Sequence, residues 1–406
     1  MSIDVYWRLP LHGCKGELAV LGYDRGDWNP PRAGNLAPGW GPRGADDVVF
    51  ADHVADIARA AEVSGFVGGL LVSFPGTDDP WTLAPALARE TKTFRFMIAF
   101  QPGFINPVHA ARLSASLQRL SGGRLVYNII TGGGGPAQLW WGDRVAHDDR
   151  YARTTEFLDV LKGVWKHGPF DFEGRFYQVE RGELAPALSA QPVPEIYFSG
   201  SSDAAVASAG RHADYYLSHL EPFDSLRVKL DRVKERAAKE GRSAKVALRF
   251  DILARPSVEE AWRDVERAFA ALPPGALDRA GGERGDAVGF ARQRSFVPSR
   301  IGGVHDLDVD QHIAPALWGG FNLFRGGPGI GVVGNYEQAA EWLDRYLRAG
   351  VDSFVLAGTP HLEEAYRVGE EVLPLVRGRT SARLAREPGA TREPPREARE
   401  PSLITS

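Results

Sequence analysis

The sequence has little cysteine, no surplus of positive charge and no long apolar run. Its one cysteine, Cys14, excludes an internal disulfide and a thiolate metal cluster, and it is compatible with a reducing compartment. A formal net charge of -4 gives no electrostatic reason to bind nucleic acid. No window approaches the roughly 18 apolar residues of a membrane span, and the N-terminus lacks the pattern of a secretory signal. We therefore expect a soluble, cytoplasmic protein.

Motifs of several common enzyme classes are also missing. Four glycines, Gly132–Gly135, follow an apolar run, but no Lys-Ser or Lys-Thr follows them, as a nucleoside-triphosphate loop requires. Residues 329–334, GIGVVG, match the dinucleotide fingerprint as letters, yet they follow FRGGP rather than a buried strand. We interpret them as a turn that opens a helix. Residues 305–312 resemble a solvated acidic loop more than a metal site, and no Gly-x-Ser-x-Gly elbow of a serine hydrolase is present.

Short apolar segments alternate regularly with stretches of helical period, which is the pattern of repeated βα units. The expected strands cover residues 3–9, 66–74, 94–100, 125–130, 194–200, 213–220, 246–254 and 352–358. Helices are expected over about 46–63, 81–90 and 149–166. Eight strands are the number that a closed barrel requires, so the fold class predicted is α/β, a (β/α)8 TIM barrel with insertions.

We expect one barrel domain over residues 1–378. Residues 168–179 have the pattern of a hairpin that leaves the barrel. Residues about 272–333 are too long for an ordinary loop, and they predict a partly helical, lid-like insertion over the mouth of the site. Residues 379–406 are rich in Arg, Glu and Pro, which predicts a disordered tail.

Polar residues stand where the expected strands end, on the face where such barrels build their sites. The run FSGSSDAA, 198–205, leads small hydroxyl residues and a glycine into a helix start, where backbone N–H groups can bind a phosphate. The run HDDRYARTTEF offers His147 and Tyr151 at another helix start, although ordinary capping by Asp148 or Asp149 explains that segment equally well.

Six segments, taken in order, resemble the bacterial luciferase-like flavin monooxygenases, and most closely the reduced-FMN-dependent alkanesulfonate monooxygenases. They are LSGGRLVYNIITG, HDDRYARTTEFLDVLKGVW, DFEGRFYQV, PEIYFSGSSDAA, LFRGGPGIGVVG and DSFVLAGTPHLEEAYRVGEEVLPLV. The resemblance covers about residues 3–377 and implies a (β/α) barrel that takes reduced FMN from a separate NAD(P)H-dependent flavin reductase. It also implies a flavin peroxide that oxygenates the substrate and, for sulfonates, cleaves the C–S bond. A homodimer or homotetramer is expected.

The resemblance implies roles for individual residues. Those matched to the cofactor are Asn128 and Thr131 at the flavin ring and ribityl chain, and His147, Tyr151, Ser201 and Ser202 at the flavin and its phosphate. Those matched to the reaction are Arg249, His12, His361 and the mobile-loop Arg325, with Asp251 as a base or orienting group. Guanidinium groups suit such a task because they stay charged and bind oxyanions with paired donors.

Three departures from the sulfonate enzymes bear on the substrate. Asp251 replaces a histidine, Thr359 a tyrosine and Thr77 a cysteine, and the loop 13–44 is longer. A carboxylate beside Arg249 disfavours a simple sulfonate, so a larger or less anionic organosulfur compound is expected. Two alternatives stay open: a hydroxylase or Baeyer–Villiger-type oxygenase of a carbonyl or natural product, and a non-catalytic partner subunit. Deazaflavin is an alternative to FMN.

Overall fold

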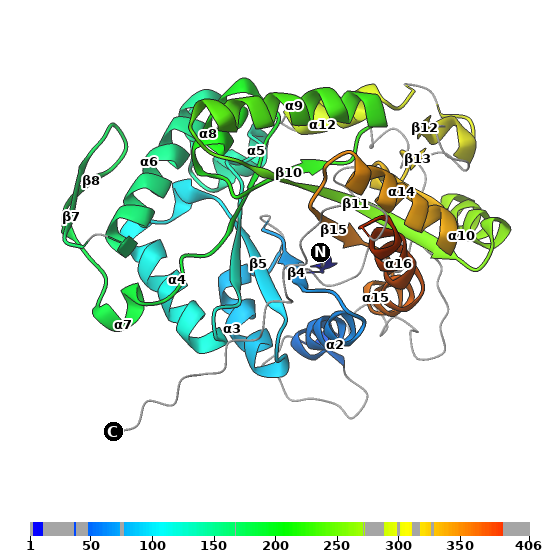
Figure 1. The fold of residues 1–406 in the computed structure, drawn as a ribbon, viewed down its shortest axis with the longest axis horizontal. Coiled ribbons are helices and arrows are strands. Elements are labelled where there is room, and N and C mark those ends of the chain that lie inside the picture. Colours follow the sequence, from blue (N-terminus) through cyan, green and yellow to red (C-terminus); the bar gives the residue numbers. More distant parts are fainter. Residues whose placement is uncertain are drawn as a thin grey trace.

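The protein is described by a computed structural model covering residues 3–10, 36–37, 48–73, 77–166, 168–270, 272, 288–298, 301–310, 317–325 and 329–384. At its centre, eight parallel strands close into a barrel (Figure 1). In order around the barrel they are β1 (Asp4–Leu9), β4 (Gly68–Leu71), β5 (Arg95–Phe100), β6 (Leu125–Ile129), β9 (Ile196–Ser199), β10 (Tyr215–His219), β11 (Lys245–Arg255) and β15 (Ser353–Ala357). Pairing of β10 with β11 completes the circle. The predicted barrel and all eight of its strands are confirmed.

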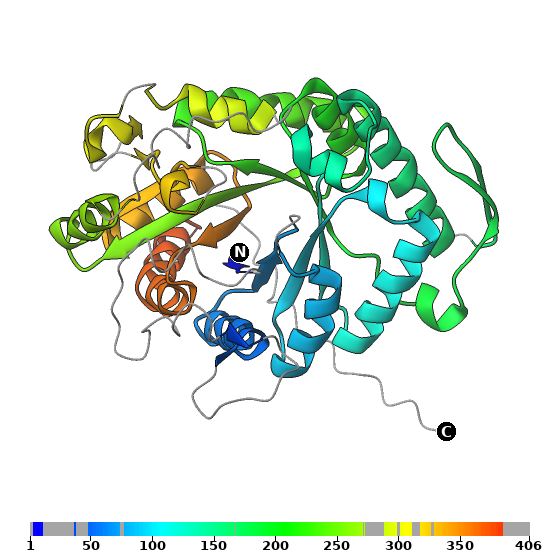
Figure 2. The same ribbon diagram turned by 180° about the vertical axis from the view of Figure 1, so that it is seen from behind.

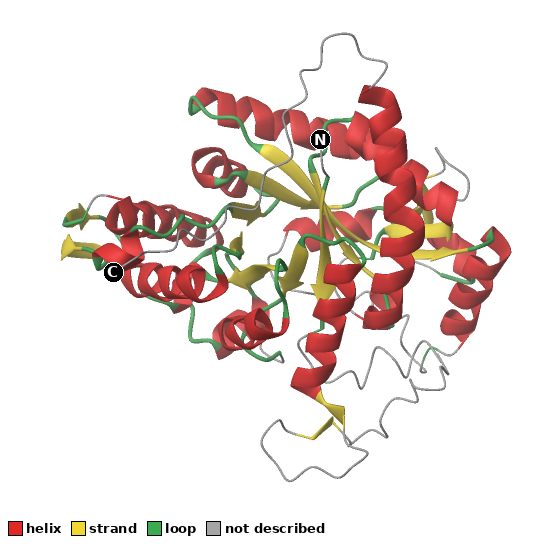
Figure 3. Ribbon diagram, turned by 60° about the horizontal axis from the view of Figure 1, so that its bottom comes forward, coloured by secondary structure: helices red, strands yellow, loops and turns green. Residues whose placement is uncertain are grey.

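Helices form a ring outside these strands (Figures 2 and 3). The longer ones are α2 (Phe50–Val63), α3 (Pro80–Glu90), α4 (Pro107–Ser121), α6 (His147–Lys166), α8 (Asp203–His212), α9 (Phe223–Lys239), α10 (Val258–Ala270), α14 (Tyr336–Arg348), α15 (His361–Arg367) and α16 (Leu373–Leu384). Short helices are η1 (Pro102–Phe104), α5 (Gly135–Trp140), α7 (Pro186–Ser189), η2 (Val304–Leu307) and the π-helical η3 (Val368–Val372). None of the helices in the described part of the chain is long and apolar enough to cross a bilayer.

Local sequence explains where these helices begin and end. Asn106 caps α4 by accepting from the Val108 N–H at 2.9 Å, and Gly122 ends the helix at φ 71°, a conformation that favours glycine. Asn335 and Gln338 form a reciprocal capping box at the start of α14.

Aromatic rings fill the amino-terminal end of the barrel. Tyr197 lies with its ring centroid 4.3 Å from that of Tyr215 in a stacked pair and 5.7 Å from that of Tyr6. Because strand side chains alternate, Trp7 points the other way, toward the helices, where its ring packs on Phe66 at 5.1 Å. On the same strands, the side chains two positions after Tyr6, Tyr197 and Tyr215 therefore also point into the barrel interior, nearer its carboxyl-terminal end.

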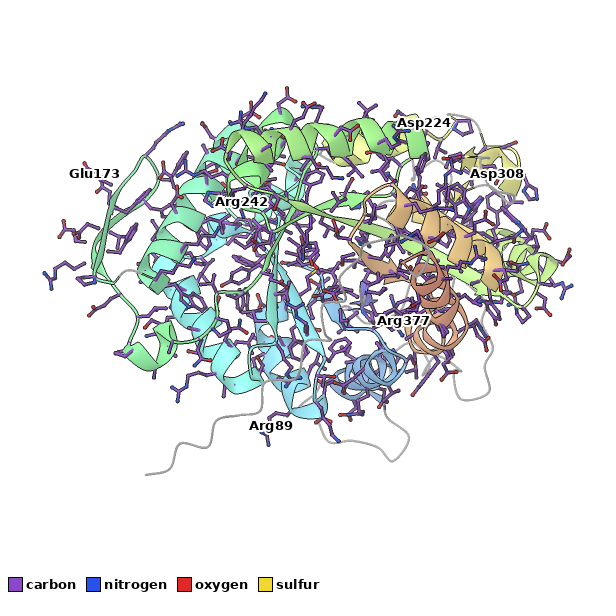
Figure 4. The ribbon with its side chains drawn as sticks, in the orientation of Figure 1. Arg89, Glu173, Asp224, Arg242, Asp308 and Arg377 are labelled. Carbon is purple, nitrogen blue, oxygen red and sulfur yellow. The ribbon has the colours of Figure 1, made fainter. Side chains whose placement is uncertain are left out.

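A hairpin of β7 (Phe170–Glu173) and β8 (Gln178–Gly182) extends beyond α6, as predicted for residues 168–179. Its turn is held by Glu156 of α6, which accepts from the backbone N–H groups of Phe176 at 2.8 Å and Arg175 at 3.0 Å. Glu173 on this hairpin and Arg89 of α3 lie at the outer edge of the molecule (Figure 4).

The described part of the insertion contains both helix and strand. Its main elements are α12 (Val288–Ser295), β12 (Asp308–Asp310), β13 (Leu317–Trp318), α13 (Asn322–Arg325) and β14 (Gly331–Asn335). The short pair β2 (Leu36–Ala37) and β3 (Val48–Val49) does not belong to the insertion. From Asp251 onward β11 pairs in parallel with β14, and β13 and β12 continue this outer sheet antiparallel.

Our interpretation of residues 329–334 as a turn was therefore wrong. Gly331 begins a buried strand, in which Val332 and Val333 are almost fully enclosed by neighbouring elements. A side chain at Gly331 would meet the Asp251 carbonyl oxygen at 2.3 Å, so close strand packing explains this glycine. The dinucleotide interpretation fails as well, because the phosphate-binding glycines of that motif lie in a turn after a strand.

The start predicted for the disordered tail, residue 379, is too early in the chain, because residues 379–384 are helical. Helix α16 continues to Leu384, because Arg379 pairs with Glu337 at 2.6 Å and Arg383 with Asp344 at 2.8 Å on α14. The remaining residues, 385–406, lie outside the described part of the chain.

Candidate active site

The carboxyl ends of the eight parallel strands meet on one side of the barrel, and polar side chains from five strands lie there. Strand register and alternation turn six of these inward: Arg8 of β1, Asn128 of β6, Ser199 of β9, His219 of β10, and Arg249 and Asp251 of β11. Arg8, Asn128, Arg249 and Asp251 are all at least nine-tenths buried. The structure thus turns Asn128, Arg249 and Asp251 toward one interior, together with Arg8 and His219, while the roles expected of them stay predictions.

One side of this interior is built around strand β6 and the loop after it. The Ser199 hydroxyl donates to Asn128 Oδ1 at 3.0 Å, and Thr131, just past the strand end, is buried. Gly132 has a φ of 93°, and a side chain there would meet Gln138 Oε1 at 2.1 Å and Gln101 Oε1 at 2.7 Å. At Gly132 a glycine is therefore required by backbone conformation and close packing.

Strand β9 leads into helix α8 through a loop of small residues. Ser202 caps α8 by accepting from the Ala205 N–H at 3.2 Å, Ser201 precedes it, and the Tyr216 hydroxyl donates to the Gly200 carbonyl oxygen. Tyr151, at the first turn of α6, is buried with its hydroxyl against Gly200. Two hydroxyl groups and a helix N-terminus therefore converge, which is a suitable environment for a phosphate.

His147 begins α6 at the rim of this loop region. Its ring packs edge-on against Tyr151 at 5.2 Å, and its Nδ1 lies 2.7 Å from Asp148 Oδ1. The contact of His147 with Tyr151 is thus present, whereas Asp148 and Asp149 stand inside the first helical turn, with Asp149 bound to Arg175, so neither acid is at the cap position.

Replacing Gly200 with alanine is expected to weaken binding of a phosphorylated cofactor. Gly200 has a φ of 148°, and the new Cβ would lie 2.5 Å from Ala205 Cβ and 2.7 Å from the Tyr151 hydroxyl. Overpacking of about 1–3 kcal/mol corresponds to roughly a tenfold or larger rise in the dissociation constant of FMN, measured by fluorescence titration. Gly241→Ala is the matched control, because Gly241 has a φ of 66° with nothing within 4 Å. Equal effects of the two variants would contradict the prediction.

A second group of buried polar side chains lies where β1 meets α2 and α15. His361 is the first residue of α15, and its Nε2 is 3.5 Å from Arg8 Nη1. A guanidinium group can only donate, so this nitrogen of His361 is the acceptor. The Trp7 indole donates to the His361 carbonyl at 3.0 Å and fixes the start of the helix. Burial, and then the nearby His361, lowers the pKa of His53 to about 4.

The buried His53 predicts a loss of stability in acid. Its folded pKa lies below the ordinary 6.5, so the unfolded chain binds the extra proton more readily between pH 6.5 and about 4. The full contribution is present above pH 6.5, and the free energy of unfolding should fall by about 3 kcal/mol as pH drops through this window. His53→Gln should flatten this part of the profile in urea titrations. An unchanged acid slope in the variant would show that His53 is not its source.

Helix α12 of the insertion lies over the ends of β9 and β10 and runs beside α9 (Figure 1). The Gly289 Cβ position would be 3.6 Å from Ser201 Oγ and 3.8 Å from His219 Cδ2. The link to the barrel is Glu221, a buried carboxylate just after β10 that accepts from Arg292 at 2.7 Å and from Lys229 at 2.8 Å. This placement supports the predicted lid-like position, while closure itself stays a prediction.

Some predicted site residues are not placed by these contacts. His12 lies outside the described residues. Arg325 is the last residue of α13, and its side chain is not described. Thr77 lies in a bend before α3. Within the described ranges, no group of three His, Cys, Asp or Glu residues could hold a metal ion.

Three polar residues of this region escaped the sequence analysis: Arg8 and His53 are buried and His219 is partly exposed. Arg8 has a visible signal, because a charged residue stands in a mostly apolar strand two positions after Tyr6. His219 is the last residue of its strand, which is the same signal that singled out other candidates. His53 has none, because a histidine on an amphipathic helix is usually a satisfied structural group.

Comparison with known proteins agrees with this architecture. The model of the luciferase-like monooxygenase family matches residues 38–353. Among solved structures, an EDTA monooxygenase from Chelativorans sp. BNC1 is similar at a TM-score of 0.67 and 20% identity, covering 94% of this chain and 95% of that one. A long-chain alkane monooxygenase and a riboflavin lyase solved with modified FMN each give a TM-score of 0.69, at 18% and 19% identity, covering 94% of this chain and 92% of theirs. At such identities these structures support the fold, and the family match carries the assignment. The chain belongs to the luciferase-like monooxygenase family.

Proposed function

We propose that this protein is a two-component monooxygenase that uses reduced FMN and O₂ to oxygenate a small organic substrate. The observation that carries the proposal is the adjacency of two sites at one end of the barrel. The α8 N-terminus with Ser201 and Tyr151 suits a phosphate, and a buried charged centre with Arg249 and Asp251 lies on β11, which β10 separates from the β9 strand that leads into α8.

The residues at this end of the barrel fit FMN. The Gln101 Oε1 atom is buried without a hydrogen-bond partner among the described residues, beside the glycine loop. A polar atom left in this state costs free energy unless a ligand group donates to it. We assign the flavin ring and ribityl chain to Asn128 and Thr131. The residues assigned to the remainder of the flavin and its phosphate are His147, Tyr151, Ser201 and Ser202.

Reduced FMN, when bound, supplies the electrons that activate O₂. The protein then has to hold the substrate, exclude water and stabilise charge that develops during oxygen transfer. Arg249 is assigned to the anionic group of the substrate, because its planar guanidinium donates two parallel hydrogen bonds to an oxyanion. Asp251 orients the substrate or accepts a proton. His12, His361 and Arg325 complete the wall, with Arg325 arriving on the insertion.

The proposed substrate is an organosulfur compound, a sulfonate or sulfone whose C–S bond is cleaved. The charged centre supports it, because two buried arginines, Arg8 and Arg249, favour an anionic group. The buried carboxylate of Asp251 favours the second candidate, a hydroxylase or Baeyer–Villiger-type oxygenase of a carbonyl compound. The proposed partner is a separate NAD(P)H-dependent flavin reductase, and the proposed assembly is a homodimer or homotetramer.

One experiment separates these candidates. Reduced FMN, generated by a flavin reductase, is supplied with ¹⁸O₂ and a panel of sulfonates, sulfones and ketones, and products are analysed by mass spectrometry and sulfite assay. Sulfite from a sulfonate, or a sulfinate from a sulfone, with one ¹⁸O atom in the released organic product supports the organosulfur reaction, whereas a labelled ester or alcohol without sulfite or sulfinate supports the second candidate. Absence of micromolar binding of reduced FMN would identify a non-catalytic subunit and overturn the proposal.

A further inference from the structure

Strand register places two buried opposite charges on either side of one small residue. In the barrel, β15 lies between β1 and β11. Asp251 is paired with Ala357 of β15, and Trp7 is paired with Leu356, so Arg8 comes level with Ala357 from the other side. Arg8 and Asp251 are 4% and 3% exposed.

Both side chains face the barrel interior. Trp7, which precedes Arg8, packs outward on Phe66, and Phe250, which precedes Asp251, packs on Phe354 at 5.8 Å in the same outer layer. Neighbouring strands are about 4.8 Å apart, so the two backbones are separated by roughly 10 Å. The methyl group of Ala357 between them leaves room for an arginine and an aspartate to meet.

Several other charged and titratable groups lie around this point in the described part of the chain. Arg249 stands two residues before Asp251 on the same face of β11, and His219 of β10 lies level with Arg249 in the strand register. His361 contacts Arg8 through Nε2, and His53 lies beside His361. A further carboxylate, Glu363, is buried in the first turn of α15. A buried charge is stable only when an opposite charge or hydrogen bonds compensate it. The charged side chains at this end of the barrel interior must therefore be considered as one set.

We propose that Arg8 is a positioning residue that shares Asp251 as a counter-ion with Arg249. When Arg8 is removed, more of the Asp251 charge is compensated by Arg249, which then binds an anionic substrate less strongly. With Arg8 present, Arg249 keeps more of its positive charge available to that substrate. The effect on substrate rests on the proposed function, whereas the charge coupling does not.

The first arm of the test measures thermal unfolding of the protein without substrate. The variants are Arg8→Met, Asp251→Asn and the double variant, with Arg8→Lys as a conservative change that keeps the charge. We expect each neutralising single variant to lower the unfolding temperature and the double variant to unfold above Arg8→Met, because both charges have been removed. The control double variant combines Arg8→Met with Asp264→Asn, since Asp264 pairs instead with Arg255 at 2.6 Å and its effect should add. Additive losses in both double variants would overturn the coupling.

The second arm measures steady-state kinetics with whichever anionic substrate is turned over, together with the dissociation constant of FMN. Arg8→Met should raise KM by about tenfold with a smaller change in kcat, whereas in the Asp251→Asn background, where kcat is already lowered, Arg8→Met should change KM by less than about threefold. The dissociation constant of FMN should stay within about threefold, which separates positioning from a general structural defect. A KM unchanged in Arg8→Met would overturn the role in substrate binding. If no substrate is turned over by the unaltered protein, the proposed function fails while the unfolding arm still decides the coupling.

Discussion

Replacing Arg249 with lysine is expected to lower kcat/KM by about 100- to 1000-fold. Arg249 is nine-tenths buried, faces inward from β11 and stands level with His219 of the neighbouring strand. Lysine keeps the positive charge, but it cannot donate two parallel hydrogen bonds to one oxyanion. Its shorter side chain would therefore leave substrate oxygens without hydrogen-bond donors in a site from which water is excluded. Single-turnover kinetics with reduced FMN and O₂ would measure the effect on the oxygenation step directly.

The dissociation constant of FMN distinguishes this effect from damage to the cofactor site. It should change by less than about threefold in Arg249→Lys, since the residues assigned to the phosphate lie on α6 and α8. Arg89→Lys is the control for the same chemical change, because Arg89 is exposed on α3 at the edge of the molecule (Figure 4). A loss below about tenfold in kcat/KM would remove Arg249 from the reaction.

Changing Glu221 to glutamine is expected to lower the free energy of unfolding by about 3–5 kcal/mol, because it leaves Lys229 and Arg292 without their shared buried carboxylate. Burial alone would raise the pKa of Glu221, but Lys229 and then Arg292 lower it below its ordinary 4.5. The contribution is therefore fully present above pH 4.5 and is lost as pH falls through the lower folded pKa. In Glu221→Gln this acid-dependent part should disappear. Denaturant titrations at pH 7 and at pH 3 would measure both effects.

An exposed ion pair supplies the control for Glu221. Glu337 contacts Arg379 at 2.6 Å with its side chain 64% exposed, so Glu337→Gln should cost less than about 1 kcal/mol. Because Arg292 belongs to α12, Glu221→Gln should also loosen the helix over Ser201, visible as faster amide exchange in residues 288–295. Equal losses of stability in the two variants would show that the Glu221 cluster does not anchor the insertion.

The barrel was predictable because its signals are local. Each strand is a short apolar run bounded by turn residues, and its helix begins with a recognisable cap, as at Asn106. The error at residues 329–334 has a different cause. Gly331 and Gly334 resemble a turn in sequence, but pairing with β11 makes them a strand, and this partner lies about eighty residues away in the chain. Long-range pairing of this kind overrides local preference.

The same distinction applies to the site. The residues assigned to the phosphate include the contiguous run 198–205, so that pattern was visible in the sequence. The buried charged residues instead depend on register between distant strands, which brings Arg8 and Asp251 level on either side of Ala357. A reader of the sequence sees Arg8 and Asp251 as separate residues more than two hundred positions apart. The resemblance to a family also gave no indication of Arg8, because it assigns roles only to residues of this chain that match a motif of the family.

Strand β11 belongs to two sheets at once, and Asp251 is the residue where they join, paired with Ala357 on one side and Gly331 on the other. The chain between these sheets leaves after α10 and returns at β14, so both of its attachment points are fixed by the same strand. A segment attached in this way can be lengthened or exchanged while β11 keeps its place in the barrel. For the same reason, chimeras of related enzymes should fold best when the two sequences are joined in the stretch from β11 to α10 and again at β14.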